Sequence, residues 1–163
     1  RGGNARRVTA LNDLWLSGKR LGEVRTLDAT APDGTAVPGW ILLPPGYQPG
    51  QKVPTILEIH GGPYTSYGPY FSTDYQLYAS AGYAVLFPNV RGSTGYGEAF
   101  ADGIEKTYPM PNEKDLMASV DAAVAAGFAD PDNLFITGGS GGGLLTAWMT
   151  GHTQRFKAAA VQK

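Results

Sequence analysis

The fold of this chain is decided by the stretch Ile136-Thr137-Gly138-Gly139-Ser140-Gly141-Gly142-Gly143-Leu144-Leu145. An apolar run at 134–136 predicts a short buried strand before the glycines, and residues 144–149 suit a helix after them. Gly138, Ser140 and Gly142 have the G-x-S-x-G spacing of a nucleophile elbow, a sharp strand-to-helix turn that exposes a reactive serine. The alternative is a glycine-rich loop that only turns the chain or binds phosphate, but Leu rather than Lys follows the last glycine.

Composition places the chain among globular proteins and excludes several classes of function. Hydrophobic residues make up 42% and charged residues 17% of its 163 residues, so neither disorder nor a membrane protein is indicated. A net charge of −1 gives no reason to expect nucleic acid or a membrane as a partner. Cysteine is absent, which excludes a thiol nucleophile and disulfides but leaves the cellular compartment open. No grouping of side chains has metal-ligand spacing, and we expect no cofactor.

The first residues predict a linker arm rather than part of a folded domain. They begin Arg1-Gly2-Gly3-Asn4-Ala5-Arg6-Arg7, without the apolar core of a signal peptide. We therefore interpret residues 1–20 as the arm that connects to a preceding domain, inside a longer chain. Residues 21–163 are interpreted as the N-terminal part of an enzyme domain.

Strand signals alternate with helix signals along the rest of the chain. Strands are expected at 23–30, 39–43, 55–59, 84–87, 134–136 and 156–161, and helices at 74–81, 97–104, 113–126 and 144–149. The Asp33-Gly34 pair marks a hairpin between the first two strands. This order predicts an α/β fold with a mixed, mostly parallel sheet and helices on both faces. We expect the sheet to be cut off after the strand that follows the elbow helix, which leaves an unpaired edge.

Three loops leave the C-terminal ends of the expected strands, where open α/β sheets bind their ligands. One is the elbow, and the others are His60-Gly61-Gly62-Pro63 and Asn89–Gly97. Glycines at 61 and 62 let the backbone face a substrate oxygen directly, as an oxyanion-hole donor must. The alternative for this loop is a Gly-Pro turn that ends a strand.

A serine nucleophile needs a base, and the sequence holds only His60 and His152. His152 lies twelve residues beyond Ser140 on one helix, which corresponds to roughly 18 Å, so we expect it at the surface. His60 belongs to the loop that follows a strand, where a structural hydrogen bond is expected. Because neither follows the chain order Ser, Asp, His, these 163 residues alone are expected to be inactive.

Charged residues near the loops have structural interpretations. Arg91 could pair with a carboxylate, either of the protein or of a substrate. Asp115 and Asp121 could be mistaken for an acid–base pair, but six residues on one helix place them on different sides, so solvated or capping roles are expected. His60, Tyr64 and Arg91 are candidates either for binding substrate or for structuring the loops.

Four motifs together resemble the prolyl oligopeptidase family of serine peptidases, in its branch of acylaminoacyl and dipeptidyl peptidases. The motifs are His60-Gly61-Gly62-Pro63, Asn89-Val90-Arg91-Gly92-Ser93-Thr94-Gly95-Tyr96-Gly97, Asp115-Leu116-Met117-Ala118-Ser119-Val120-Asp121 and Gly138-Gly139-Ser140-Gly141-Gly142-Gly143. The resemblance runs from about residue 21 to residue 163. It implies an α/β-hydrolase domain, a Ser-Asp-His triad, an N-terminal β-propeller and cleavage of short peptides.

The resemblance also implies roles for individual residues. Ser140 corresponds to the nucleophile, the Gly141 N–H to one oxyanion donor, and the Gly61/Gly62 backbone to the other. Relatives with Tyr at position 60 use its hydroxyl in the oxyanion hole, whereas His here favours a backbone donor. Many relatives carry an aromatic residue at position 141, where this chain has Gly.

The predicted function is therefore hydrolysis of short peptides through an acyl-enzyme on Ser140. The expected partners are peptide substrates and the remainder of the same protein, which would supply the triad Asp and His and the propeller; an oligomer is possible. Two alternatives remain open: a carboxylesterase or lipase of the same fold, and a hydrolase-fold module without catalysis.

Overall fold

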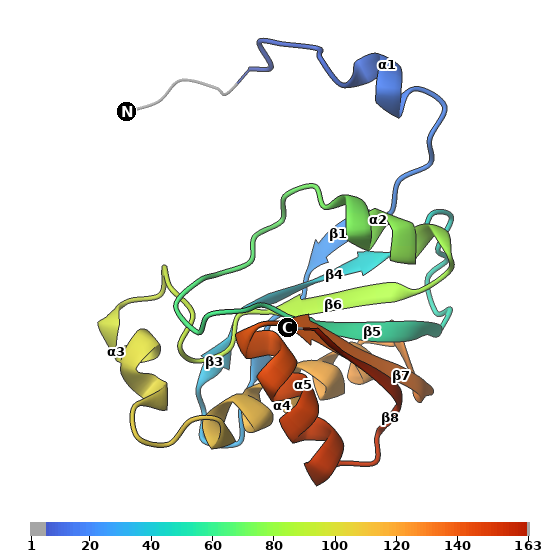
Figure 1. Cartoon of the computed structure of the whole chain (residues 1–163). Helices are drawn as coiled ribbons and strands as arrows, with labels where there is room; N and C mark the ends of the chain where they lie inside the picture. Colours follow the sequence, from blue (N-terminus) through green and yellow to red (C-terminus); the bar gives the residue numbers. More distant parts are fainter. Residues whose placement is uncertain (1–5, 163) are drawn as a thin grey trace.

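A six-stranded sheet forms the centre of the protein in the computed structural model, which describes residues 6–162 (Figure 1). Its spatial order is β1-β4-β6-β5-β7-β8. The strands are β1 (Glu23–Thr26), β4 (Gly39–Leu43), β5 (Val53–Ile59), β6 (Ala84–Pro88), β7 (Ala129–Gly139) and β8 (Phe156–Gln162). The last four pair in parallel, while β4 runs antiparallel to β1 and β6. The predicted mixed, mostly parallel sheet is thus confirmed.

Helices cover both faces of this sheet, as predicted (Figure 1). Strand β6 contributes to the core on both faces, because successive side chains of a strand point to opposite sides of the sheet. Leu86 packs with residues of α4 (Met110–Ala125) and α5 (Gly141–His152), whereas Val85 and Phe87 pack with α2 (Thr73–Ser80). Shorter elements are α1 (Asp13–Leu16), α3 (Glu98–Ala101), η1 (Asp102–Ile104) and the hairpin strands β2 (Ala29–Thr30) and β3 (Ala36–Val37).

Three expected boundaries were wrong, each for a local reason. The strand expected at 23–30 divides into β1 and β2, which pair with different partners, β4 and β3. The helix expected from residue 113 already begins at Met110, because the first turn of a helix does not need the N–H that Pro111 lacks. The strand expected from residue 134 already begins at Ala129 and contains a bulge, where the Asp130 carboxylate accepts from the Asp132 N–H.

Residues 6–20 extend from the body as an exposed segment (Figure 1). Val8, Leu11 and Leu14 are each more than four-fifths exposed, at 81%, 87% and 89%. The Trp15 ring meets Phe71 edge-on, with centroids 6.3 Å apart. A domain boundary at residue 20 stays a prediction. Within residues 6–162, no helix combines the length and apolar character needed to cross a membrane.

Helix α5 crosses β5 and β8 so closely that only glycine fits at the contact. A Cβ atom on Gly142 would lie 2.0 Å from the Ile59 carbonyl oxygen, and one on Gly143 would lie 2.0 Å from the Gln162 carbonyl oxygen. Both positions are buried. A glycine near the other end of the helix, Gly151, has nothing within 4 Å of such an atom. The glycines of the elbow therefore set the distance between helix and sheet.

We expect Gly142→Ala to lower the free energy of unfolding by about 3 kcal/mol, because the new methyl group meets backbone that cannot move aside. Gly151→Ala in the same helix is the matched control. It should raise the free energy of unfolding by about 0.5–1 kcal/mol, since Ala is the better helix former. Urea denaturation of the two variants measures both values, and equal effects would contradict the close-packing argument.

Candidate active site

Ser140 stands at the junction of β7 and α5 in a strained backbone conformation. Its φ of 56° and ψ of −118° lie outside the regions that a non-glycine residue normally occupies. The residue is exposed, and its side chain caps no backbone N–H of α5. Its own N–H donates to the Gln162 carbonyl at 3.2 Å. A strained, exposed serine at a strand-to-helix turn has the geometry of a nucleophile elbow.

The loop after β5 lies directly against this serine. A Cβ atom on Gly61 would be 3.2 Å from Ser140 Cβ and 3.7 Å from its Oγ. A Cβ atom on Gly141 would be 2.7 Å from the Gly62 carbonyl oxygen and 3.2 Å from Gly62 N. The two glycine-rich segments predicted to meet at the strand ends therefore do meet, backbone to backbone.

Two backbone donors beside Ser140 are free to bind an oxygen. The Gly141 N–H is at the first position of α5, where no carbonyl of the preceding turn can accept from it. Across residues 6–162, no backbone or side-chain acceptor takes the Gly62 N–H. Gly62 has φ +117°, a conformation that favours glycine. Unpaired N–H groups at a helix N-terminus form the kind of environment that stabilises an oxyanion.

The His60 side chain belongs to a buried hydrogen-bond network. The residue is only 8% exposed. Its Nδ1 lies 2.7 Å from the Gly61 carbonyl oxygen, and its Nε2 lies 2.8 Å from Ser93 Oγ. Burial lowers the pKa of His60, and the bond to the Gly61 carbonyl offsets this only in part. The imidazole is therefore neutral near pH 7 and has both nitrogens occupied.

Further hydrogen bonds connect the loop at 89–97 to the loop after His60. Thr94 N–H donates to the Thr65 carbonyl at 2.9 Å. The Asn89 side chain accepts from Tyr67 N–H at 2.7 Å and donates to the Tyr67 carbonyl at 3.1 Å. Asn89 is fully buried, so these bonds are shielded from water and hold the two rim loops together.

Arg91 pairs with protein carboxylates, and the expectation for Asp115 was wrong. Asp115 is neither solvated nor a cap: it is fully buried and accepts from Arg91 Nε, Arg91 Nη2 and the Arg91 backbone N–H at 2.7–3.1 Å. Arg91 also pairs with Asp33, whose pKa falls to about 2 because its carboxylate accepts hydrogen bonds from Arg91 and Thr35. The carboxylates beside Arg91 raise its own pKa further. Asp121 is exposed, as expected, and pairs with Arg155.

Tyr64 and His152 face solvent. Tyr64 follows the Gly62-Pro63 turn and is 64% exposed, so its side chain stands free beside the serine loop. His152 ends α5, where its Nδ1 lies 2.8 Å from the Trp148 carbonyl oxygen and its ring stacks on Trp148. In the part of the chain that the structure describes, neither histidine is hydrogen-bonded to Ser140.

Glu58 is a titratable residue near the site that the sequence analysis did not single out. It lies on β5 two residues before His60, on the side of the sheet that α2 covers. Burial, and secondarily the nearby charge of Asp74, raises the pKa of Glu58 to about 7. The signal was present in the sequence as one charged residue in the otherwise apolar run 55–59.

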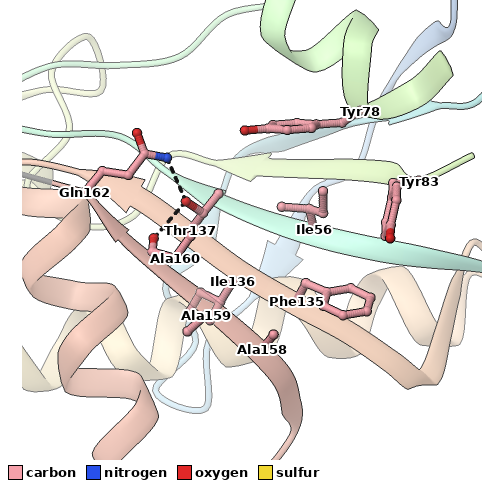
Figure 2. Close-up of a pocket in the computed structure, with 10 residues that line it drawn as sticks. All are labelled: Ile56, Tyr78, Tyr83, Phe135, Ile136, Thr137, Ala158, Ala159, Ala160 and Gln162. Carbon is pink, nitrogen blue, oxygen red and sulfur yellow. Dashed lines mark hydrogen bonds between the residues drawn. The ribbon is translucent and has the colours of Figure 1, made fainter. Parts of the chain in front are cut away.

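A groove on the side of the sheet that α2 covers is lined mainly by apolar side chains and holds no reactive group (Figure 2). Its volume is about 260 Å³. Ile56, Tyr83 and Phe135 line one part, and the alanines of β8 line another. At its end Gln162 Nε2 donates to Thr137 Oγ1 at 3.0 Å, and Thr137 Oγ1 donates to the Ala160 carbonyl at 2.8 Å. The candidate active site is therefore the rim with Ser140 and not this groove.

Comparison with known proteins fits this geometry. A family model described as the prolyl oligopeptidase family matches residues 69–163, more than half of the chain. The chain belongs to the prolyl oligopeptidase family. It is 36% identical over 163 residues to the uncharacterized peptidase YuxL of Bacillus subtilis, covering 99% of this chain and 25% of the relative. It is 32% identical over 131 residues to dipeptidyl-peptidase 5 of Porphyromonas gingivalis, covering 79% of this chain and 19% of the relative.

Solved structures place the fold in the same family. The acylaminoacyl peptidase of Pyrococcus horikoshii superposes with a TM-score of 0.86 at 32% identity, over 94% of this chain and 25% of that protein. The sheet and its helices are thus those of an α/β-hydrolase domain of a peptidase family. The chain spans about a quarter of the length of these relatives.

Removing the buried carboxylate of Asp115 should destabilise the protein strongly. We expect Asp115→Ala to lower the free energy of unfolding by about 3–5 kcal/mol, because Arg91 loses its main partner while its guanidinium remains mostly buried. Asp121→Ala, six residues along the same helix, removes an exposed pair and should cost less than about 1 kcal/mol. Thermal and urea unfolding compare the two variants, and a cost below 1 kcal/mol for both would refute a structural role for the pair.

Glu58 should make stability fall as pH rises. Its pKa in the folded protein is about 7 and its ordinary value is 4.5, so between these values the folded state binds more protons than the unfolded state. The free energy of unfolding should therefore decrease from pH 5 to pH 8, on the order of 2 kcal/mol. Glu58→Gln should remove this decrease, whereas Glu105→Gln, at an exposed position, should keep it. Urea titrations across this range provide the measurement.

Proposed function

We propose that Ser140 is the nucleophile of a serine peptidase that hydrolyses short peptides, of the acylaminoacyl or dipeptidyl type. The observation that carries the proposal is the strained, exposed Ser140 beside two unpaired backbone donors, Gly141 N–H and Gly62 N–H. Relatives named as acylaminoacyl and dipeptidyl peptidases support the substrate class.

The proposed reaction begins with attack of Ser140 Oγ on the scissile carbonyl carbon. The carbonyl oxygen becomes an oxyanion, which accepts from Gly141 N–H and Gly62 N–H. The C–N bond then breaks, the amine leaves with a proton, and an acyl-enzyme remains for water to hydrolyse. Each oxyanion donor of this kind is worth about 3 kcal/mol in the transition state.

The reaction also needs a base for the Ser140 proton. Both nitrogens of His60 are occupied in the buried network, and His152 lies at the far end of α5. We propose that the base and the carboxylate that orients it come from a further part of the same protein. On this proposal the 163 residues alone do not turn over substrate.

The surroundings of the site suggest how that further part contacts this chain. Strand β8 is the outer strand of the sheet in the described residues, and most of its length is exposed. The apolar groove of Figure 2 adjoins it. We propose that the remainder of the protein covers this edge and groove, that residues 1–20 are a linker from an N-terminal propeller, and that residues 21–163 are part of the hydrolase domain. Tyr64 is proposed to contact substrate.

The test uses the longest natural protein that contains this chain. It should hydrolyse aminoacyl or acyl-aminoacyl anilides and react with a fluorophosphonate, and Ser140→Ala should abolish both by removing the attacking oxygen. A polypeptide of residues 1–163 serves as the second arm and should show no turnover.

Each departure from this outcome has a separate meaning. Hydrolysis of p-nitrophenyl esters without hydrolysis of peptide anilides would replace the peptidase by a carboxylesterase. Absence of fluorophosphonate labelling at Ser140 would indicate a hydrolase-fold module without catalysis. Turnover by residues 1–163 that requires Ser140 would show that the base lies within them.

A further inference from the structure

We propose that Glu58 is one half of an ion pair that binds the remainder of the same protein to this chain. The other half is a Lys or Arg side chain on a segment that occupies the apolar groove of Figure 2. The proposal rests on the proposed function in one respect, namely that the remainder of the protein covers this groove. It adds the chemistry of that contact and names the residue that receives it.

Glu58 differs from the other carboxylates of the chain because it is withdrawn from water and has no partner. Among residues 6–162, no ion pair or hydrogen bond reaches its carboxylate. The other acidic side chains without a partner are all exposed, namely Asp74, Glu98, Asp102 and Asp132. Glu58 is only partly exposed. An acidic side chain that is half withdrawn from water and unpaired is incomplete as it stands.

The groups that face Glu58 in the described part of the chain supply no positive charge. His60, on the same strand, is neutral and has both ring nitrogens occupied. The titratable groups around Glu58 on α2 and on the loop before it are Asp74, Tyr75, Tyr78 and Tyr67. Burial and the charge of Asp74 raise the pKa of Glu58 to about 7. The site therefore has negative charge and hydroxyl groups but lacks a cation.

Glu58 lies beside the polar end of the groove. The sheet register pairs it with Thr137 on β7, and Thr137 lines the groove. Figure 2 shows Thr137 and Gln162 at one end of the groove and Phe135 toward the other. Tyr78 lines the groove from α2, and burial and then the charge of Glu58 raise the pKa of Tyr78, so the two side chains lie near each other. The groove is thus apolar along most of its length, with a carboxylate beside one end.

The Glu58 carboxylate is open to a partner from outside. In residues 6–162, Asn112 Oδ1 is the only fully enclosed side-chain oxygen or nitrogen atom that has no hydrogen bond. The oxygens of Glu58, which have no partner either, therefore keep some contact with solvent. A side chain that enters along the groove can reach them without any rearrangement of the sheet.

A cation on the covering segment is what this combination of groups requires. Once the groove is covered, the Glu58 carboxylate loses its remaining water, and an unpaired carboxylate in apolar surroundings strongly opposes such burial. A Lys or Arg side chain offsets this cost through charge-assisted hydrogen bonds. Relatives offer enough chain for such a segment, because this chain covers only 25% of the Bacillus subtilis peptidase. The occupant is therefore a segment of the same polypeptide with apolar side chains and one cation at its end.

The ion pair would also fix where this segment meets the active site. Thr137, the register partner of Glu58, is three residues before Ser140 in the sequence, about 10 Å away at the rise of a strand. A segment that is held at Glu58 therefore passes close to the rim, where Ser140 needs its base. Glu58 is a positioning residue in this proposal, because it holds the segment and does not touch substrate.

The sign of one substitution tests the ion pair in the longest natural protein that contains this chain. Glu58→Gln should lower the melting temperature at pH 8 by at least about 5 °C, because the cation stays buried without its partner. If Glu58 has no partner, the same substitution removes a desolvated charge and should raise the melting temperature. Glu105→Gln, at an exposed carboxylate, is the matched control and should change it by less than about 1 °C.

A photo-crosslinking residue identifies the segment. With p-benzoylphenylalanine in place of Ala158, an exposed residue of the groove, we expect a cross-link to a peptide of the same polypeptide that contains Lys or Arg. Replacement of that cation by Glu, combined with Glu58→Lys, should restore at least half of the lost melting temperature. The kcat for an aminoacyl anilide should fall about tenfold in Glu58→Gln and recover in the swapped pair, with KM within about twofold.

Several results would overturn the proposal. A higher melting temperature in Glu58→Gln at pH 8 would exclude the ion pair, and so would a cross-linked peptide without Lys or Arg. Cross-links between isotopically labelled and unlabelled copies would assign the groove to an oligomer contact, and no cross-link at all would leave it uncovered. None of these results depends on catalysis. A parent protein that neither hydrolyses anilides nor reacts with a fluorophosphonate would instead overturn the proposed function of Ser140.

Discussion

The close approach of helix α5 to the ends of β5 and β8 is the constraint on which the rest of this structure depends. At Gly142 and Gly143 a single methyl group would lie 2.0 Å from a carbonyl oxygen of the neighbouring strands. This close approach forces the chain to turn sharply between β7 and α5. Ser140 lies at the turn and has a strained backbone conformation, with φ 56°. The exposed serine is thus a consequence of packing beneath it.

The polar network around the site serves the same geometry. Interior polar groups lower stability unless they are fully paired, yet Asn89, Ser93 and Asp115 are all almost completely buried here. Each of them bonds to the loops at 60–67 or 89–97. Apolar side chains could fill this space but could not fix the direction of a peptide plane. The network is best understood as what holds the glycine-rich loop in one conformation.

The sequence was sufficient to predict the sheet, the elbow and the meeting of the rim loops, because each depends on a local pattern. Buried strands appear as short apolar runs, and the elbow appears as a fixed spacing of glycines around Ser140. The features that the sequence could not reveal depend on tertiary contacts. Asp115 looked like a solvated carboxylate because nothing near it in the chain predicts that Arg91, 24 residues earlier, lies against it. The raised pKa of Glu58 likewise comes from burial under α2, a contact between separate elements.

The glycine at position 141 shows how the elbow and the loop at 61–62 limit one another. In the sequence, the absence of an aromatic side chain at position 141 is a departure from many relatives. The structure gives a physical reason for the glycine. A Cβ atom there would lie 2.7 Å from the Gly62 carbonyl oxygen, so any side chain at 141 requires the loop at 61–62 to move. Gly141 therefore allows the backbone contact between the elbow and this loop.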